Sequence, residues 1–343
     1  MKRCIAILLV LILASLACSL DFNPPPLSLT PPSQVASSTP IMLQPTLIPT
    51  IIPITATATQ VVPTATETQV PSTATTVVSV LTVEQLRNAT LTVMGSDQIL
   101  RTIRLKDGKY QQGTDPAQTG YVSVTLGEKI AFGDLNADGV DDAAITMAEN
   151  YGGSGVFVSV VAVLNQGGQL NAVATALIED RAIINDLAIK NGEIYLDATI
   201  HDTNDAMCCP SLPSTRNYRL VENELVLSRF TTKTPNGAER SITIESPANG
   251  AEISGAFVIK GSVTISPFEN NLVYTVFLPG TKDPVAQAGF TISADGLGGP
   301  GTFELPLDFT SAGFKGSARV EISDVSPADG SYLALNTLFL TLK

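Results

Sequence analysis

The sequence has no tryptophan, a single histidine and four cysteines in 343 residues. Without Trp, the commonest stacking platform for sugars is missing, although Tyr and Phe remain. Basic residues are also few: 20 Lys and Arg stand against 32 Asp and Glu, for a net charge of -12 and a pI near 4.5. This balance disfavours nucleic acids and anionic membrane surfaces as partners, because both repel an acidic protein.

The N-terminal apolar run, Ile5 to Leu16, is too short to cross a bilayer and follows Lys2 and Arg3. This pattern predicts a signal peptide over residues 1–17. The segment Ser15-Leu16-Ala17-Cys18 resembles the bacterial lipoprotein box, in which the cysteine becomes the lipidated first residue of the mature chain.

The lipoprotein resemblance implies lipidation at Cys18 and an extracytoplasmic protein anchored to the cell membrane. The family prefers Leu where Ser15 stands. Ser15 and Ala17 suit ordinary signal peptidase equally well, so a secreted, unanchored protein is the alternative.

Residues 18–81 are rich in Pro and Thr, and Glu67 is the only charged residue between positions 22 and 80. Proline fixes φ and removes backbone donors, so this composition predicts a disordered linker without persistent helix or sheet. We expect an extended, semi-rigid stalk that separates the folded part from the membrane.

Residues 82–230 predict a β-rich meander domain with one short helix. Thr82-Val83-Glu84-Gln85 has the pattern of a capping box at a helix start. The pairs Asp107-Gly108 and Asn191-Gly192 are typical of primed hairpin turns, and Glu222-Asn223 marks another turn. Apolar and polar residues alternate from Ile194 to His201, which predicts a strand with one buried face.

The densest chemical signal is the loop from Gly133 to Asp142, which reads GDLNADGVDD. Side chains at alternate positions of a tight loop can point inward together, and calcium takes six to eight oxygen ligands. Gly139 supplies the sharp turn that a residue with a Cβ would resist. The predicted ligands are Asp134, Asn136, Asp138, the Val140 carbonyl and Asp142.

This loop resembles the calcium loop of the integrin-type FG-GAP repeat, including the preceding Phe132-Gly133. An EF-hand would place a Glu where Ile145 stands, so Asp142 is expected to close the site instead. The resemblance implies a structural calcium ion, not a catalytic one. The alternative is an Asp/Asn/Gly turn without an ion.

A second unusual cluster runs from His201 to Pro210 and contains Cys208 and Cys209. With Cys4 removed in the signal peptide and Cys18 lipidated, these are the only thiols left. In an oxidising compartment they are expected to form a disulfide between adjacent residues. Free or intermolecular thiols, and a zinc or Cys–His catalytic role, are the alternatives.

The glycine-rich segment Gly152-Gly153-Ser154-Gly155 does not match a phosphate loop or a nucleophile elbow. The residues that follow, Val156-Phe157-Val158, are typical of a strand and not of a helix that could hold phosphate. No Gly stands two residues after Ser154, and His201 is the only histidine. We expect a flexible turn beside the calcium loop.

After a polar linker at 231–239, residues 240–343 predict short strands at β-sandwich spacing. Five motifs in this region resemble the immunoglobulin-like domain of bacterial spore-germination proteins. They are SPANG at 246–250, VIKG at 258–261, FEN at 268–270, GTF at 301–303 and SPADGS at 326–331. The resemblance implies a binding module without catalytic residues. The region has no Cys or Trp, so its core must be aliphatic and Phe-based.

The sequence therefore predicts a mainly β protein, with a meander domain followed by an immunoglobulin-like β-sandwich. We expect a cell-surface, lipid-anchored binding or envelope-structural protein with a structural Ca2+ site. Its expected partners are the membrane, through the anchor, and an unknown extracellular protein or envelope polymer. The alternative is an extracytoplasmic enzyme, a hydrolase or thiol oxidoreductase, that uses the cluster from His201 to Cys209.

Overall fold

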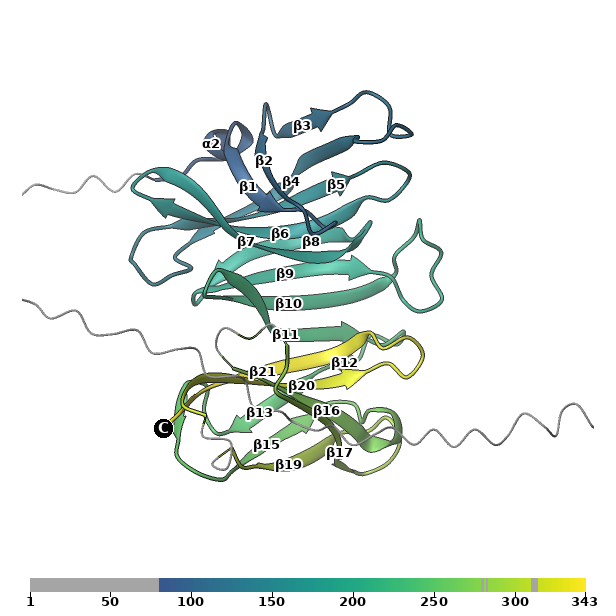
Figure 1. Ribbon diagram of the computed structural model, residues 1–343. Helices are drawn as coiled ribbons and strands as arrows, with labels where there is room; N and C mark the ends of the chain where they lie inside the picture. The colour runs from purple at the N-terminus through teal and green to yellow at the C-terminus, as the bar shows by residue number, and fades with distance from the viewer. Residues whose placement is uncertain (1–79, 279–280, 282, 310–313) are drawn as a thin grey trace, which may run out of the picture. The chain divides into compact units, whose positions relative to one another are not determined.

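The computed structural model describes residues 80–278, 281, 283–309 and 314–343. The chain divides into two units, Met1–Pro71 and Ser72–Lys343, and every described residue belongs to the second. The predicted signal peptide, the lipidated Cys18 and nearly all of the stalk lie outside the described residues. The described part is mainly β, as predicted, and neither of its helices is long and apolar enough to span a membrane (Figure 1).

The predicted capping box starts the one α-helix of this part, α2 (Val83–Arg87). The Thr82 hydroxyl accepts from the Gln85 backbone N–H at 3.2 Å, and the Gln85 side chain accepts from the Thr82 N–H at 2.8 Å. Leu86 on this helix is fully buried. It packs with the hairpin of β1 (Thr90–Met94) and β2 (Leu100–Arg104) against one face of the next sheet.

Five antiparallel strands follow one another in sequence and in space, which gives the predicted meander. They are β3 (Lys109–Gln112), β4 (Val122–Gly133), β5 (Asp142–Asn150), β6 (Phe157–Gln166) and β7 (Gln169–Asp180).

The middle of this five-stranded sheet is buried on both faces. Ala143, Ile145 and Met147 face α2 and the first hairpin, whereas Ala144 and Ala162 face the opposite core. Two-sided burial explains why β5 and β6 are almost continuously apolar.

A ten-stranded sheet runs through the rest of the described chain. Its path is β17 (Ala286–Thr291), β16 (Asn271–Phe277), β20 (Gly316–Val325), β21 (Tyr332–Leu342), β11 (Glu224–Lys233), β10 (Leu212–Val221), β9 (Glu193–Ile200) and β8 (Ile183–Lys190). Two short strands join off this path, β12 (Glu239–Arg240) beside β11 and β14 (Ala251–Ile253) parallel to β21.

The β8–β11 part of the large sheet covers the second face of the five-stranded sheet (Figure 1). Its hairpin turns are the predicted ones: Asn191 and Gly192 have φ of 52° and 75°, and Glu222 and Asn223 have φ of 48° and 66°. The alternation predicted from Ile194 to His201 is the pattern of β9, whose Ile194, Leu196 and Ala198 are fully buried.

The residues expected as a linker, 231–239, are strand at both ends, with a turn at 234–238 between β11 and β12. Strand β11 continues to Lys233, and β12 pairs back with it through Thr232 and Arg240. The buried Thr232 also donates from its hydroxyl to the Leu333 carbonyl oxygen at 2.7 Å. Thr231 and Thr232 are β-branched and have pairing partners on neighbouring strands, which favours a strand here. The large sheet therefore continues across the expected boundary between the 82–230 and 240–343 regions.

The C-terminal region is a β-sandwich, as predicted. A four-stranded sheet of β13 (Ile242–Ser246), β15 (Phe257–Val263), β19 (Gly301–Leu307) and β18 (Ser293–Ala294) packs against the β16–β20–β21 part of the large sheet. The core is aliphatic with a few Phe residues. Phe290 and Phe303 meet there edge to face, with ring centroids 5.7 Å apart.

Candidate functional site

The acidic loop joins β4 to β5, and the pairing of Gly133 with Asp142 closes its base. Gly139 has φ of 82°, the left-handed conformation expected from the sharp turn, and Ala137 has φ of 63°. A Cβ at Gly133 would meet the Ile189 side chain, so the base of the loop lies against β8. The loop therefore sits where the five-stranded and ten-stranded sheets approach each other.

Asp134 organises the first half of the loop. One carboxylate oxygen accepts from the Ala137 N–H at 2.7 Å, and the other accepts from the Gly139 N–H at 2.8 Å. The N–H groups of Asn136 and Asp138 lie at 3.2 and 3.3 Å from the first oxygen. These donors, the Gly139 N–H above all, lower the pKa of Asp134.

Asn136 and Asp138 are bound to each other and to the loop backbone. The Asn136 amide donates to one carboxylate oxygen of Asp138 at 2.9 Å, and the Val140 N–H donates to the other at 2.8 Å. Both side chains therefore stabilise the turn by themselves, in the manner of Asx turns.

Asp142 is the buried member of the set. It is completely inaccessible to solvent and accepts from the Leu135 N–H at 2.9 Å and from the Asn165 N–H at 2.8 Å. Burial raises the pKa of Asp142, the two N–H donors lower it, and the nearby charges of Asp138 and Asp134 raise it again. The carboxylate thus ties the loop to the end of β6 while keeping two other carboxylates close.

The donor set fits calcium in chemistry, since every proposed ligand offers oxygen. Its arrangement is that of a hydrogen-bonded turn, because the carboxylates point at loop N–H groups. In the part of the chain that the structure describes, no three His, Cys, Asp or Glu side chains are gathered closely enough to hold a metal. The calcium site stays a prediction.

The cysteine loop connects β9 to β10, and the sulfur atoms of Cys208 and Cys209 are bonded to each other. Asp205 holds the loop together by accepting from the N–H of Asp202 at 2.8 Å and from the N–H of Ser211 at 2.7 Å. These bonds lower the pKa of Asp205.

His201 lies at the start of the same loop but is turned to β7. Its backbone N–H donates to Glu179 at 2.8 Å, and its ring Nδ1 is 3.4 Å from the other Glu179 oxygen. Its Nε2 is buried, with no hydrogen-bond partner among the described residues. No contact among the described residues joins His201 to Cys208 or Cys209.

The glycine-rich turn at 152–155 joins β5 to β6, at the opposite end of β5 from the acidic loop. The expected position beside the calcium loop is therefore wrong, because the whole length of β5 separates the two. The turn is instead linked to the cysteine loop. The Arg181 guanidinium donates to the Ser154 carbonyl and, at 3.1 Å, to the Met207 carbonyl.

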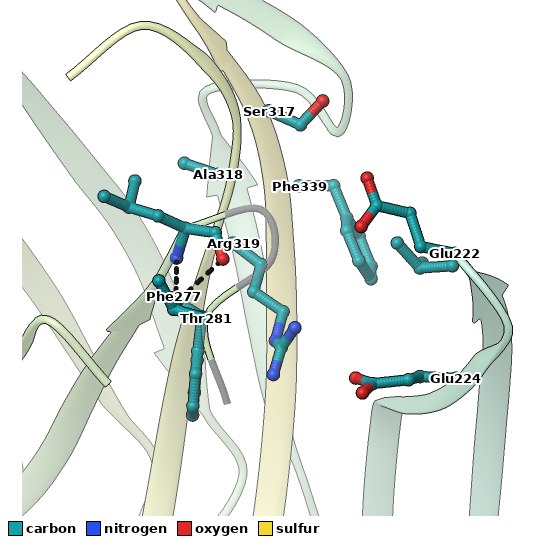
Figure 2. A pocket seen from close by; sticks show the side chains of 10 residues that line it. Glu222, Glu224, Phe277, Thr281, Ser317, Ala318, Arg319 and Phe339 are labelled. Carbon is teal, nitrogen blue, oxygen red and sulfur yellow. Dashed lines mark hydrogen bonds between the residues drawn. The ribbon is translucent and has the colours of Figure 1, made fainter. Parts of the chain in front are cut away.

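A hollow that the sequence did not indicate lies where β11 and β21 separate (Figure 2). These strands pair only through Arg229 with Asn336 and Phe230 with Leu335. Further along, the backbone of Phe339 bonds to Asn249 and Gly250 instead of to β11. The hollow has a volume of about 180 Å³ and lies between the β10–β11 turn and strands β16, β20 and β21.

A comparison with known protein families finds a match to residues 241–331, which contain strands β13 to β20. No curated protein matches the chain. The matched segment covers most of the sandwich but well under half of the chain. It matches the family described as the immunoglobulin-like domain of bacterial spore germination.

Proposed function

We propose that this protein is a lipid-anchored, cell-surface binding protein without enzymatic activity. An immunoglobulin-like domain of the matched family fits a binding or structural role, and this match is the observation on which the proposal depends. The predicted signal peptide, the lipidated Cys18 and the Pro/Thr-rich stalk support display outside the cell. The expected partner is an extracellular protein or an envelope polymer.

The proposal includes a structural calcium ion held by Asp134, Asn136, Asp138, the Val140 carbonyl and Asp142. Its support is the environment of Asp142, which is buried near two other carboxylates and has no Lys or Arg partner among the described residues. A bound cation would offset that repulsion. Because Asp142 also bonds to Asn165, the ion would brace one end of the five-stranded sheet.

The binding role is tested by sedimentation of the purified protein with isolated envelope polymer and with outer-surface proteins, with and without millimolar calcium. We expect the protein to sediment together with at least one of these fractions. Absence of binding under all conditions would contradict the role. Changing Cys18→Ser should release the protein from the membrane, and unchanged localisation would favour the secreted alternative.

Calcium is tested by melting temperature. Extracellular sites of this kind bind at about 10⁻⁴–10⁻³ M, so millimolar calcium should add ~1 kcal/mol, or about 2–4 °C. Asp134→Ala and Asp138→Ala should abolish the rise. Asp329→Ala is the matched control, because Asp329 also accepts a loop N–H, from Ser331 at 3.1 Å, in the distant 326–331 turn. If calcium does not raise the melting temperature of the unchanged protein, the loop is a turn without an ion.

The enzyme alternative requires Cys208 and Cys209 to be reactive, either as free thiols or as a disulfide that is easily reduced. Mass spectrometry of the mature protein distinguishes the two states by two hydrogen masses. A closed disulfide that survives mild reductant would count strongly against thiol chemistry, whereas free thiols would favour it.

A further inference from the structure

The floor of the hollow beside β21 consists of side chains that strand pairing places next to one another. Phe277 pairs with Arg319, and Arg319 pairs with Phe339, so the three side chains form one row across β16, β20 and β21. The neighbouring residues Val276, Val320 and Leu338 belong to the sandwich core. Because side chains alternate along a strand, the row lies on the opposite face of the sheet.

Arg319 is held in this row by its neighbours. Its guanidinium carbon lies 4.0 Å from the centre of the Phe277 ring, and its Nε donates to Glu321 at 3.2 Å. Among the described residues, no hydrogen-bond partner of its two terminal nitrogens is found. Arg319 thus forms an ion pair with the Glu321 carboxylate through Nε, and its terminal nitrogens keep hydrogen-bonding capacity for an anion.

The opposite wall is acidic. Glu222 lies in the β10–β11 turn and Glu224 directly follows it; both are exposed, and both line the hollow. Figure 2 shows the side chains of Arg319 and Glu224 pointing into the same space from opposite sides. No ion pair joins Arg319 to either glutamate within 4.0 Å. Opposite charges thus face each other across a gap. The Phe339 ring lines the same hollow, and the guanidinium carbon of Arg219 lies 4.8 Å from the centre of that ring.

We propose that this hollow binds a small zwitterion with an apolar middle, such as a short peptide with free ends. The ligand's carboxylate would accept from the terminal nitrogens of Arg319, and its ammonium would donate to Glu222 and Glu224. Its apolar part would lie against the side of Phe339 that lines the hollow, next to the guanidinium of Arg219. A volume of 180 Å³ is smaller than the roughly 300–1,000 Å³ of sites for drug-sized ligands, which favours a ligand of one or two residues. The inference is independent of the calcium site and of the lipid anchor.

The test is isothermal titration of the full-length protein with the dipeptide L-alanyl-L-leucine. Its N-acetylated form lacks the ammonium group, and its C-terminal amide lacks the carboxylate. We expect the dipeptide to bind with a Kd below about 1 mM. Blocking either end should weaken binding about tenfold, the effect of losing a charged hydrogen bond. Free L-leucine distinguishes a peptide site from an amino-acid site, because its two charges are adjacent.

Variants of Arg319 and Glu224 test which end of the dipeptide each of these residues binds. Arg319→Gln should weaken dipeptide binding about tenfold without changing the affinity of the amide. Glu224→Gln should weaken dipeptide binding similarly without changing the affinity of the acetylated form. Arg319→Lys keeps the positive charge and provides a second variant if Arg319→Gln fails to fold. The controls are Arg229→Gln and Glu304→Gln, two exposed residues outside the hollow, which should change nothing.

Two outcomes would overturn the proposal. The first is no measurable heat with millimolar dipeptide, which would mean that the two walls bind no such ligand. The second is equal weakening of blocked and unblocked ligands in the Arg319→Gln and Glu224→Gln variants, which would show an effect on folding and not on recognition.

Discussion

The five-stranded sheet and the four-stranded sheet of the sandwich are both antiparallel, but they are buried differently. In β5, every residue from Asp142 to Met147 is buried, whereas buried and exposed residues alternate strictly along β19. The first sheet lies between two cores, and the second has one face in solvent. The number of covered faces, and not strand propensity, therefore determines which positions must be apolar.

The largest expected effect on stability comes from substitutions at adjacent positions of one strand in each sheet. Ala143→Asp and Ala144→Asp introduce carboxylates on opposite faces of β5, and both positions are fully buried. We expect each variant to lose several kcal/mol or fail to fold, because neither charge gains a partner. In β19, Leu305→Asp should be similarly damaging and Glu304→Ala should be mild. Urea unfolding followed by circular dichroism measures all four, and a stable Ala144→Asp variant would break the contrast.

A buried ion pair near the boundary of the two regions is expected to have the next largest effect. Arg240 on β12 donates to Asp324 on β20 at 2.7 Å, and Asp324 is 2% exposed. Arg240→Met should cost about 2–3 kcal/mol, somewhat less than a fully buried pair, because it leaves a buried negative charge unpartnered. The double variant Arg240→Met, Asp324→Asn should recover much of that loss in a denaturant titration. No recovery would mean that the packing of Arg240, and not its charge, matters.

The stability contributed by the acidic loop at the start of β5 is expected to depend on pH. Burial raises the pKa of Asp142 in the folded state above 3.8. Without calcium, the stability contributed by this carboxyl is greatest below pH 3.8 and falls as the pH rises through the raised pKa. Calcium needs the ionised form, so its effect on melting temperature, about 2–4 °C, should be full at pH 7 and vanish on acidification through the same window.

Melting curves with and without added calcium, recorded between pH 3 and pH 7, test this dependence. The Asp142→Asn variant is the control and should show no calcium effect at any pH. A calcium effect that persists unchanged below pH 3.8 would contradict a role for the Asp142 carboxylate.

The smallest effect is expected on the solvent face of the sandwich. Lys260 pairs with Glu304 at 2.6 Å across β15 and β19, and both side chains are more than half exposed. Lys260→Ala should change the free energy of unfolding by less than about 1 kcal/mol, since solvent screens the pair. A loss as large as that of Arg240→Met would show that this face is covered by something in solution.

Local signals in the sequence predicted much of the fold. The Thr82–Gln85 capping box and the turns at Asn191-Gly192 and Glu222-Asn223 were all confirmed, because each depends on neighbouring residues alone. The alternation in β9 was confirmed for the same reason. The aliphatic sandwich core was confirmed because the region contains no Cys or Trp to build it from. The acidic loop lies between β4 and β5, with Gly139 in the left-handed conformation, and its calcium ion stays a prediction.

The sequence by itself thus determined the β class, the turns and the spacing of the acidic residues. Only the tertiary structure decided which strands from distant parts of the chain lie side by side. It paired β11 with β21, buried Asp142 against Asn165, and aligned Phe277, Arg319 and Phe339 in one row. These pairings depend on register between segments far apart in the chain, and a shift of one residue would turn every side chain to the other face.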